Sequence, residues 1–396
     1  MTELMRLEQK ILLLSKLNNV NRQETSKNEV EKLYYRSSSL RSSVERNLPH
    51  RITYQISRNC SEKFQMSSFS GFVNQPRFCF NASWNSNAAT FANSGTVGQY
   101  PRGIFIDKNN TIYLADDQNN RILIWSDGST SPTRYMPGSL SNPYAIFVTS
   151  DVNIYVNYND NVSSTRRVDQ WTLRTNIITN VTITPLACFG IFIDISSTLY
   201  CSMASADQVV KKWLSNNSTT FTIIAGTHSS GGGSNQLYEP HGIFVDTNFD
   251  LYVADSKNNR IQLFRPGETN GRTVAGSGSS SSTYTLDYPT AVILDADKYL
   301  FIFDSGTTRI IGTDRTAFRC LAGCSPSPSS GFDRFKYPWY SSFDSHGNIF
   351  VVDSENNRVQ KFLLSTNSCG LYLTSIHESA MYSHLTFIVD KSCFQK

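Results

Sequence analysis

The stretch Pro240–Phe264, PHGIFVDTNFDLYVADSKNNRIQLF, contains two short runs rich in β-branched and aromatic residues, Gly242–Asp246 and Leu251–Asp255. Turn-forming residues separate the two runs, which predicts a β-hairpin. A second turn, Ser256–Asn259, is followed by five residues in which polar and apolar side chains alternate, as they do in a third strand. The stretch therefore predicts a three-stranded antiparallel unit.

A fourth short strand, Thr273–Gly276, follows after a Pro-Gly turn, and the whole unit recurs along the chain. The six copies begin at Pro101, Pro143, Cys188, Pro240, Pro289 and Pro338. A single sheet of this size cannot bury both of its faces, so tandem copies must stack on one another. We therefore predict an all-β fold, a six-bladed β-propeller of four-stranded antiparallel blades.

The sixth copy has no fourth strand of its own. The third, fourth and fifth copies end in an Ala-Gly stretch, but none follows Val359–Leu363 before Cys369. Residues 88–93, AATFAN, precede the first copy and fit the missing position. A propeller that takes its last strand from the other terminus leaves no exposed sheet edge. We expect residues 88–93 to close the ring, with a Cys79–Cys369 disulfide as a clasp.

The chain divides into four regions by composition. Residues 1–50 predict a leader, helical or disordered, because their short apolar stripe ends after Leu14. Residues 51–87 form an irregular N-terminal segment, 88–370 hold the propeller, and 371–396 form a C-terminal tail without an indicated role. No apolar run is long enough for a membrane span or for the core of a signal peptide.

The eight cysteines include no CxxC pair and no Cys/His zinc spacing. Cys188 and Cys201 fall within one predicted hairpin, and Cys320 and Cys324 bracket a turn, so both pairs are candidate disulfides beside Cys79–Cys369. Reduced, buried thiols are the alternative. Disulfides favour an extracellular location, whereas the N-terminus has no signal sequence, so the compartment stays open.

Asn-x-Ser/Thr triplets would permit N-glycosylation in an oxidising compartment. Their number is about what chance gives in a chain so rich in Asn, Ser and Thr, so the sequence allows a glycoprotein without indicating one. The triplets begin at Asn59, Asn81, Asn109, Asn161, Asn180, Asn216 and Asn217.

The repeated motif resembles that of the NHL-repeat proteins, whose units contain P-x-G-I-a-V-D, I-Y-V-A-D and S-x-N-N-R-I. The resemblance is closest in Pro240–Phe264, Pro101–Trp125 and Pro338–Phe362. It implies a six-bladed β-propeller that serves chiefly as a binding platform. The second copy, with NYNDNVSSTRRV, and the third, with MASADQVV, depart from the motif. We expect their blades to keep the fold but not the loop geometry.

One position differs in every copy while the residues around it repeat. It is the residue that enters the innermost strand, directly after the repeat proline or Cys188, and we expect it at the mouth of the central channel. Aromatic and Arg side chains at such a place are frequent anchors of a partner. Packing around the channel is the alternative interpretation. The candidate binding residues are Arg102, Tyr144, Phe189, His241, Thr290 and Trp339.

Four copies carry an Asp before the second turn and an Arg after it. A ring of metal-binding or acid-base carboxylates is one interpretation. An Asp at this position also bonds the backbone of its own turn, and the Arg can brace adjacent blades. We therefore interpret the pairs as structural and predict no metal site and no cofactor. The pairs are Asp116 and Arg121, Asp255 and Arg260, Asp304 and Arg309, and Asp353 and Arg358.

The favoured function is non-enzymatic recognition of a protein, peptide or small ligand at the mouth of a monomeric ring. One alternative is a metal-dependent enzyme, either a hydrolase or one resembling the amidating lyases, whose zinc is held by several His. Of the six His, only His241 occupies a mouth position. The other alternative is an RNA-binding or ubiquitin-ligase substrate-recognition module, although the zinc-binding domains of such ligases are missing.

Charge weighs against nucleic acid as a partner. Residues 1–50 contain nine Lys or Arg against six Asp or Glu, which is +3 of the total net charge of +4. The repeat region is therefore almost neutral, whereas a nucleic-acid surface is usually strongly basic.

Overall fold

The computed structural model describes residues 74–367 apart from gaps at residues 80, 137–139, 161–164, 185, 215–219, 280–283, 314–317 and 325–334. The leader, the first part of the 51–87 segment and the tail lie outside the described residues. Within the described part, no helix is long and apolar enough to cross a lipid bilayer.

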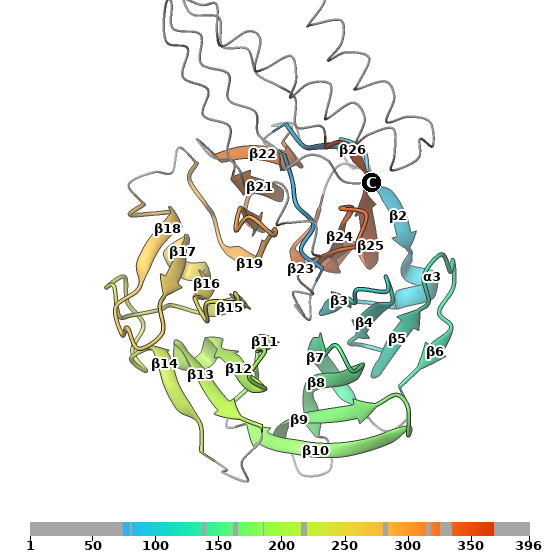
Figure 1. Ribbon diagram of the computed structural model, residues 1–396, viewed down its shortest axis with the longest axis horizontal. Helices are drawn as coiled ribbons and strands as arrows, with labels where there is room; N and C mark the ends of the chain where they lie inside the picture. The colour runs from blue at the N-terminus through green and yellow to red at the C-terminus, as the bar shows by residue number, and fades with distance from the viewer. Residues whose placement is uncertain are drawn as a thin grey trace, which may run out of the picture. The chain divides into compact units, whose positions relative to one another are not determined.

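Six four-stranded antiparallel sheets surround a central axis (Figure 1), which confirms the predicted six-bladed β-propeller. In each blade the first strand is innermost. Blade 1 contains β3 (Ile104–Ile106), β4 (Ile112–Asp116), β5 (Arg121–Trp125) and β6 (Arg134–Tyr135). Blade 2 contains β7 (Ser141–Val148), β8 (Asn153–Asp160), β9 (Thr165–Thr172) and β10 (Ile177–Thr184). Blade 3 contains β11 (Gly190–Ile193), β12 (Thr198–Met203), β13 (Gln208–Trp213) and β14 (Thr222–Gly226).

The second half of the ring repeats the arrangement. Blade 4 contains β15 (Pro240–Val245), β16 (Leu251–Asp255), β17 (Arg260–Phe264) and β18 (Arg272–Gly276). Blade 5 contains β19 (Pro289–Leu294), β20 (Leu300–Asp304), β21 (Arg309–Thr313) and β22 (Phe318–Ala322). Blade 6 contains β23 (Pro338–Phe343), β24 (Ile349–Asp353), β25 (Arg358–Phe362) and, from the N-terminal side, β2 (Ala89–Ala92).

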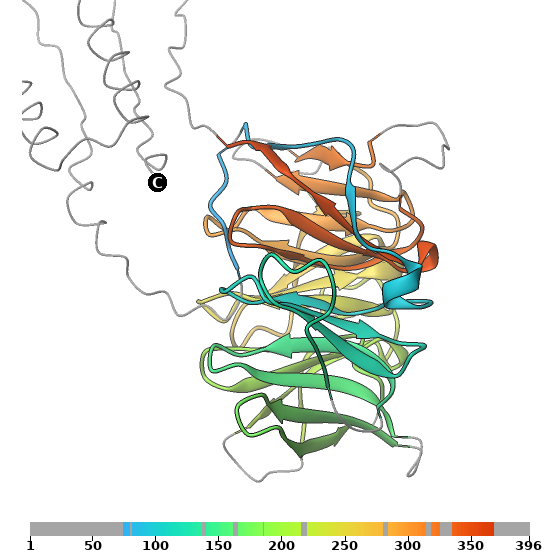
Figure 2. The ribbon, with the colours of Figure 1, turned by 90° about the vertical axis from the view of Figure 1, so that its right-hand side faces the viewer.

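The ring closes as the sequence predicted. Strand β2 pairs antiparallel with β25, with Ala89 opposite Lys361 and Ala92 opposite Val359. A short helix, α3 (Ser94–Val97), then leads into blade 1. A two-stranded ribbon, β1 (Ser83–Trp84) with β26 (Leu364–Thr366), adds a second link between the two ends of the propeller. Figure 2 shows β2 running beside the blade that it completes.

The core lies between the faces of neighbouring blades. The repeat motif places a Phe at the same position of the innermost strand in blades 1 to 4, and all four are buried. Their rings contact one another in sequence, at centroid distances of 5.0 Å (Phe105–Phe147), 4.8 Å (Phe147–Phe192) and 5.2 Å (Phe192–Phe244). The apolar repeat positions therefore become inter-blade contacts.

The polar part of the repeat also joins blades. Asn259 has φ 54°, a left-handed conformation that Asn tolerates better than most residues, and its Oδ1 accepts a hydrogen bond from Tyr288 N of the next blade at 2.9 Å. The same bond is made at three other junctions. The pairs are Asn120 with Asn142 N, Asp207 with Glu239 N and Asn357 with Tyr100 N.

The four repeat Asp carboxylates are fully buried and each accepts from the Nε of its Arg, at 2.7 to 3.0 Å. In blade 4, Arg260 also donates to the carbonyls of Gly232, Gly233 and Gln236, which precede the blade. Burial raises the pKa of Asp255, while the bonds from Asn258, Tyr238 N and Arg260 act in the opposite direction. These contacts are the ones expected of structural Asp/Arg pairs.

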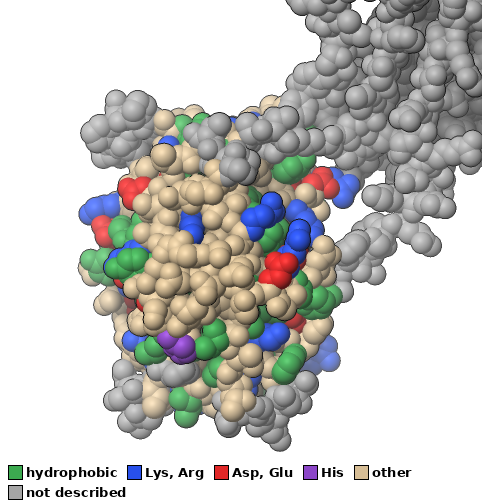
Figure 3. Space-filling view, turned by 90° about the vertical axis from the view of Figure 1, so that its left-hand side faces the viewer, with side chains coloured by type: hydrophobic (Ala, Val, Ile, Leu, Met, Phe, Trp, Pro, Cys, Tyr) green, Lys and Arg blue, Asp and Glu red, His purple; other side chains and the backbone are tan. Residues whose placement is uncertain are grey.

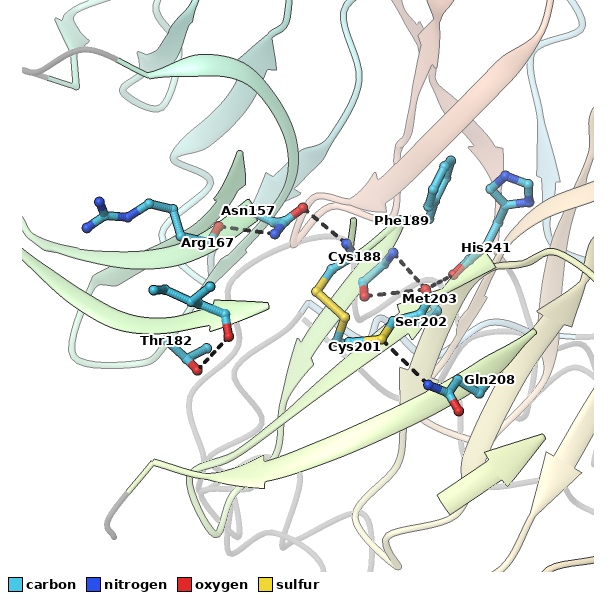
Figure 4. Close-up of a disulfide and its surroundings, with 12 residues drawn as sticks. Asn157, Arg167, Thr182, Cys188, Phe189, Cys201, Ser202, Met203, Gln208 and His241 are labelled. Atoms are coloured by element: carbon cyan, nitrogen blue, oxygen red, sulfur yellow. Dashed lines mark hydrogen bonds between the residues drawn. A yellow bond between two sulfur atoms is a disulfide. The ribbon is translucent and has the colours of Figure 1, made fainter. Parts of the chain in front are cut away.

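Two of the three candidate disulfides are present. Cys188–Cys201 joins the start of blade 3 to β12, and Cys320–Cys324 closes the short loop after β22. Figure 4 shows the first of them directly beside Phe189. The Cys79–Cys369 bond involves a residue outside the described part of the chain and stays a prediction.

Candidate functional site

The residue two positions before each mouth residue has a strained backbone conformation in most blades. In five blades the residue before the repeat proline is not glycine and yet has a positive φ, a conformation found mostly where the surroundings enforce it. The inter-blade bonds described above hold four of these residues in place. The five are Tyr100 (52°), Asn142 (48°), Glu239 (48°), Tyr288 (52°) and Tyr337 (57°).

Five of the six candidate residues meet at the mouth, and Trp339 is at their centre. Its ring centroid lies 6.0 Å from that of Tyr144, 6.4 Å from Phe189 and 5.2 Å from His241. The Arg102 guanidinium lies 5.0 Å from the same ring. Trp339 of blade 6 therefore contacts side chains from blades 1, 2, 3 and 4 and covers this end of the channel.

A hydrogen bond next to Trp339 in the sequence also connects blade 6 with blade 3. The hydroxyl of Tyr340 donates to Phe189 O. Gly190 makes room for this approach, because a Cβ there would lie 2.9 Å from the Tyr340 hydroxyl and 2.8 Å from His241 O. The side chains of Phe189 and His241 stand beside each other at the mouth (Figure 4), with ring centroids 4.9 Å apart.

Thr290 does not join the aromatic cluster. It is 1% exposed, and its hydroxyl bonds Ser305 Oγ at 2.6 Å and Pro338 O at 2.8 Å. Its contacts are those of a packing residue between blades 5 and 6.

Sequence reasoning missed the residue after the repeat Asp, which pairs with the mouth residue of its own blade. Arg102 Nε donates to Asp117 at 3.0 Å, and His241 Nδ1 bonds Ser256 Oγ at 2.7 Å. In blade 5, Ser305 pairs in the same way with Thr290. The position could have been found, because it opens the loop between the second and third strands, which also borders the mouth.

His241 is buried and neutral. Burial lowers its pKa to about 4, and the ring is only 5% exposed. Ser256 Oγ lies 2.6 Å from Pro289 O, which can only accept, so the single hydroxyl proton is donated there. Nδ1 of His241 can then donate to Ser256, and the ring also has a hydrogen bond with the Glu239 backbone.

Two further tyrosines enlarge the aromatic surface, and both occupy the strained position before the repeat proline. Tyr337 stacks on Trp339 at 5.7 Å, and Tyr288 lies 5.4 Å from His241 and 6.1 Å from Tyr337. The side chain of Tyr337 is exposed. An aromatic residue before the proline in three copies, including Tyr100, was the available sequence signal.

The opposite end of the channel is covered by the chain segment that precedes the ring. Asn74 Nδ2 donates to Asp107 O at 2.7 Å and Phe343 O at 3.2 Å, where the innermost strands of blades 1 and 6 end. Gln75 Nε2 bonds Asp295 O at 3.3 Å in blade 5, and Phe78 N donates to the Asp295 carboxylate. The cavity under this segment, about 10 Å³, holds no more than a water molecule.

The described histidines do not converge. His241 lies at the mouth and His346 in the hairpin turn at the other end of β23, while His228 lies in the turn that follows β14. Among the described residues no group of three or more His, Cys, Asp or Glu is arranged to hold a metal ion.

The NHL repeat family model matches residues 237–264 and 335–362, which include the Asn-Asn-Arg turns of blades 4 and 6. The chain is a six-bladed β-propeller that contains NHL repeats. Its sixth blade supplies Trp339, and its fourth supplies His241, so both matched repeats reach the mouth.

Solved structures show the same fold at low sequence identity. A protein of unknown function from Bacteroides thetaiotaomicron is 16% identical, with a TM-score of 0.58 over 72% of this chain and 77% of that one. An auxiliary nutrient binding protein from the same organism is 16% identical (TM-score 0.52, 75% and 76% covered). A gluconolactonase from Xanthomonas campestris is 10% identical (TM-score 0.51, 73% and 97% covered). At these identities the likeness concerns the fold alone.

Proposed function

We propose that this NHL propeller is a non-enzymatic binding protein that holds a protein, peptide or small ligand on the mouth surface formed by Arg102, Tyr144, Phe189, His241 and Trp339. The observation that carries the proposal is the convergence of four side chains, one each from blades 1 to 4, onto Trp339 of blade 6. The scaffold repeats from blade to blade, but the residues brought together at this point are all different.

The composition of the surface supports the proposal. Trp, Tyr and Arg dominate the energetics of protein interfaces, because they bury a large area for little loss of side-chain freedom. The surface is rigid before any partner arrives, since Asp117 holds Arg102 and Ser256 holds His241. A pre-ordered surface loses less entropy on binding.

On the side of the ring shown in Figure 3, there is no large patch of uniformly positive or negative side chains that could serve as an alternative binding surface. There, Lys and Arg side chains are interspersed with Asp, Glu and uncharged ones. This mixture does not favour nucleic acid as the partner.

The test is a comparison of two tryptophan variants. Panning a random peptide library against the full chain should enrich binders, and Trp339→Ala should weaken the best of them by about ten-fold or more. Trp213→Ala is a surface control, because Trp213 is 49% exposed and lies at the end of β13, away from the mouth. Trp339 is only 7% exposed, so a melting curve must also show that Trp339→Ala is folded. Equal binding by wild type and Trp339→Ala would move the site away from the mouth.

A further inference from the structure

Arg102 has donor groups left over at the mouth. Its Nε donates to Asp117 and its Nη1 donates to Tyr144 OH, both at 3.0 Å. A guanidinium carries five N–H donors, and Nη2 has no partner among the described residues. The side chain is 24% exposed. Nη2 of Arg102 can therefore donate to a ligand. A carboxylate fits the planar guanidinium best as the acceptor.

The acidic side chains near the mouth are largely neutralised. Glu239 pairs with Lys257 at 2.5 Å and accepts from Tyr288 OH at 3.0 Å. Glu355 pairs with Lys336 at 3.2 Å. Asp287, which is exposed on the blade 5 side, has no ion pair within the described part of the chain. Asp287 precedes blade 5 and therefore does not lie in the blades that carry Arg102 and Arg166.

A second cation stands near the Arg102 side of the mouth. Arg166 lies near the start of β9, opposite Asn159 of β8, so it borders the loop between the second and third strands of blade 2, and its side chain has no bonding partner among the described residues. Burial raises the pKa of Tyr144 to about 12, and the charges of Arg102 and Arg166 oppose this effect. Asp117 offsets the charge of Arg102, whereas no described carboxylate forms an ion pair with Arg166.

The ligand must lie on the mouth rather than enter the channel, because Trp339 spans it. Small molecules usually bind in concave pockets, whereas flat aromatic surfaces with an Arg are typical of protein partners. A peptide can place a carboxylate and a neighbouring side chain on such a surface together.

We propose that the mouth recognises a peptide segment of a partner protein that carries a carboxylate next to an aromatic or aliphatic side chain. The carboxylate pairs with Arg102 and Arg166, and the apolar side chain packs on Trp339 and Phe189. This inference rests on the proposed function. The carboxylate is either an Asp or Glu side chain or the free C-terminus of the partner.

Two random peptide libraries separate these sources. One displays the peptides with a free C-terminus, and the other displays them internally, so that only Asp and Glu supply carboxylates. The full chain should enrich peptides with an acidic group beside an apolar residue, and the library that yields them identifies the source. The enriched peptide is then synthesised with Gln, Asn or a C-terminal amide in place of the carboxylate, and its affinity should fall by about ten-fold or more.

Variants of the protein complete the test. Arg102→Gln combined with Asp117→Asn removes both charges without burying an unpaired carboxylate, and it should abolish the preference for the acidic over the neutral peptide. Arg166→Gln should reduce the preference several-fold. Arg134→Gln, on the outer strand β6, is the matched control and should leave it unchanged. Melting curves confirm that each variant is folded.

Three outcomes are distinguishable. Binders that depend on Trp339 but show no acidic preference would overturn the carboxylate site and leave the binding function standing. Binders insensitive to Trp339→Ala, or no enrichment in either library, would overturn both. An acidic preference that survives the Arg102→Gln, Asp117→Asn double variant would also overturn the assignment to Arg102.

Discussion

The two ends of the channel are closed by different means. At the mouth, side chains that differ in every blade meet on Trp339, and the floor that they form is largely aromatic. At the opposite end, Asn74 and Gln75 bond backbone carbonyls where innermost strands end, and Phe78 N donates to the Asp295 carboxylate. The contrast shows that repeated positions in this ring carry the architecture, whereas the positions that vary form the mouth, where we propose that recognition takes place.

Removing the closing strand should have the largest effect. Deleting residues 79–93 takes away β1, β2 and the contacts of Ala92 and Phe91 with blade 6, which leaves β25 as an exposed edge. We expect the melting temperature to fall by more than about 10 °C, or the ring not to fold. Deleting residues 1–50 should cost far less. Similar melting temperatures for the two truncations, measured by calorimetry, would contradict ring closure by this strand.

A core substitution at the covered end should reduce stability without touching recognition. Phe343 is 1% exposed and packs against Phe78 (5.2 Å) and Phe301 (4.9 Å). Phe343→Ala should therefore lower the free energy of unfolding by about 3–5 kcal/mol in denaturant titrations. Peptide affinity at the mouth should stay within about two-fold of wild type, under conditions where the variant is folded. A matching loss of affinity would show that the two ends are coupled.

The two ends should respond to pH with opposite sign. The folded-state pKa of His241 is lowered to about 4, so its stabilising contribution is complete above about pH 6.5 and is lost as the pH falls toward 4. The folded-state pKa of Asp295 is raised to about 7 by burial, so its contribution is complete below about pH 4 and is lost as the pH rises toward 7. The change amounts to about 3.5 kcal/mol at most for His241 and about 4.5 kcal/mol at most for Asp295, since one pKa unit corresponds to about 1.4 kcal/mol.

Two neutral variants measure these contributions separately. His241→Gln should reduce the acid-side loss between pH 6.5 and 4, and Asp295→Asn should reduce the loss between pH 4 and 7, in unfolding free energies measured across that range. The Asn amide cannot accept from Phe78 N in one orientation, so the comparison uses the slope with pH rather than the absolute stability. Parallel slopes for wild type and either variant would contradict the assignment for that residue.

The fold of the propeller could be predicted from the sequence, because the strands, turns and apolar positions can be recognised in each repeat. The missing fourth strand of copy six even located β2 in advance. The site was predicted only in part. Arg102, Tyr144, Phe189, His241 and Trp339 do meet, but their reach across the channel depends on side-chain length and on Gly190. Thr290 occupies the equivalent position and is too short to join them, so it bonds Ser305 instead.

The contacts of residues outside the repeated motif were the hardest to predict from the sequence. Asn74 and Gln75 belong to a segment without a period, and their bonds go to backbone carbonyls, which every residue has. Asp117 and Ser256 were hidden for another reason, because a residue that follows a strongly repeated Asp is easily taken as part of the turn. Their role became visible only through the distances to Arg102 and His241.

The smallest expected effect is a gain in the free energy of unfolding, from a substitution at the junction between blades 5 and 6. Thr308 has φ 56° and occupies the place of Asn259, but it offers no amide oxygen to Tyr337 N, for which the described residues provide no acceptor. Thr308→Asn should supply the inter-blade bond seen at four other junctions and relieve a β-branched residue of a left-handed backbone. We expect a stabilisation of about 0.5–1.5 kcal/mol, measured by urea unfolding. The reciprocal Asn259→Thr should destabilise the ring by a similar amount.

Because Tyr337 stacks on Trp339, a Thr308→Asn variant that gains stability should also hold the mouth more rigidly, and slower dissociation of a bound peptide would show it.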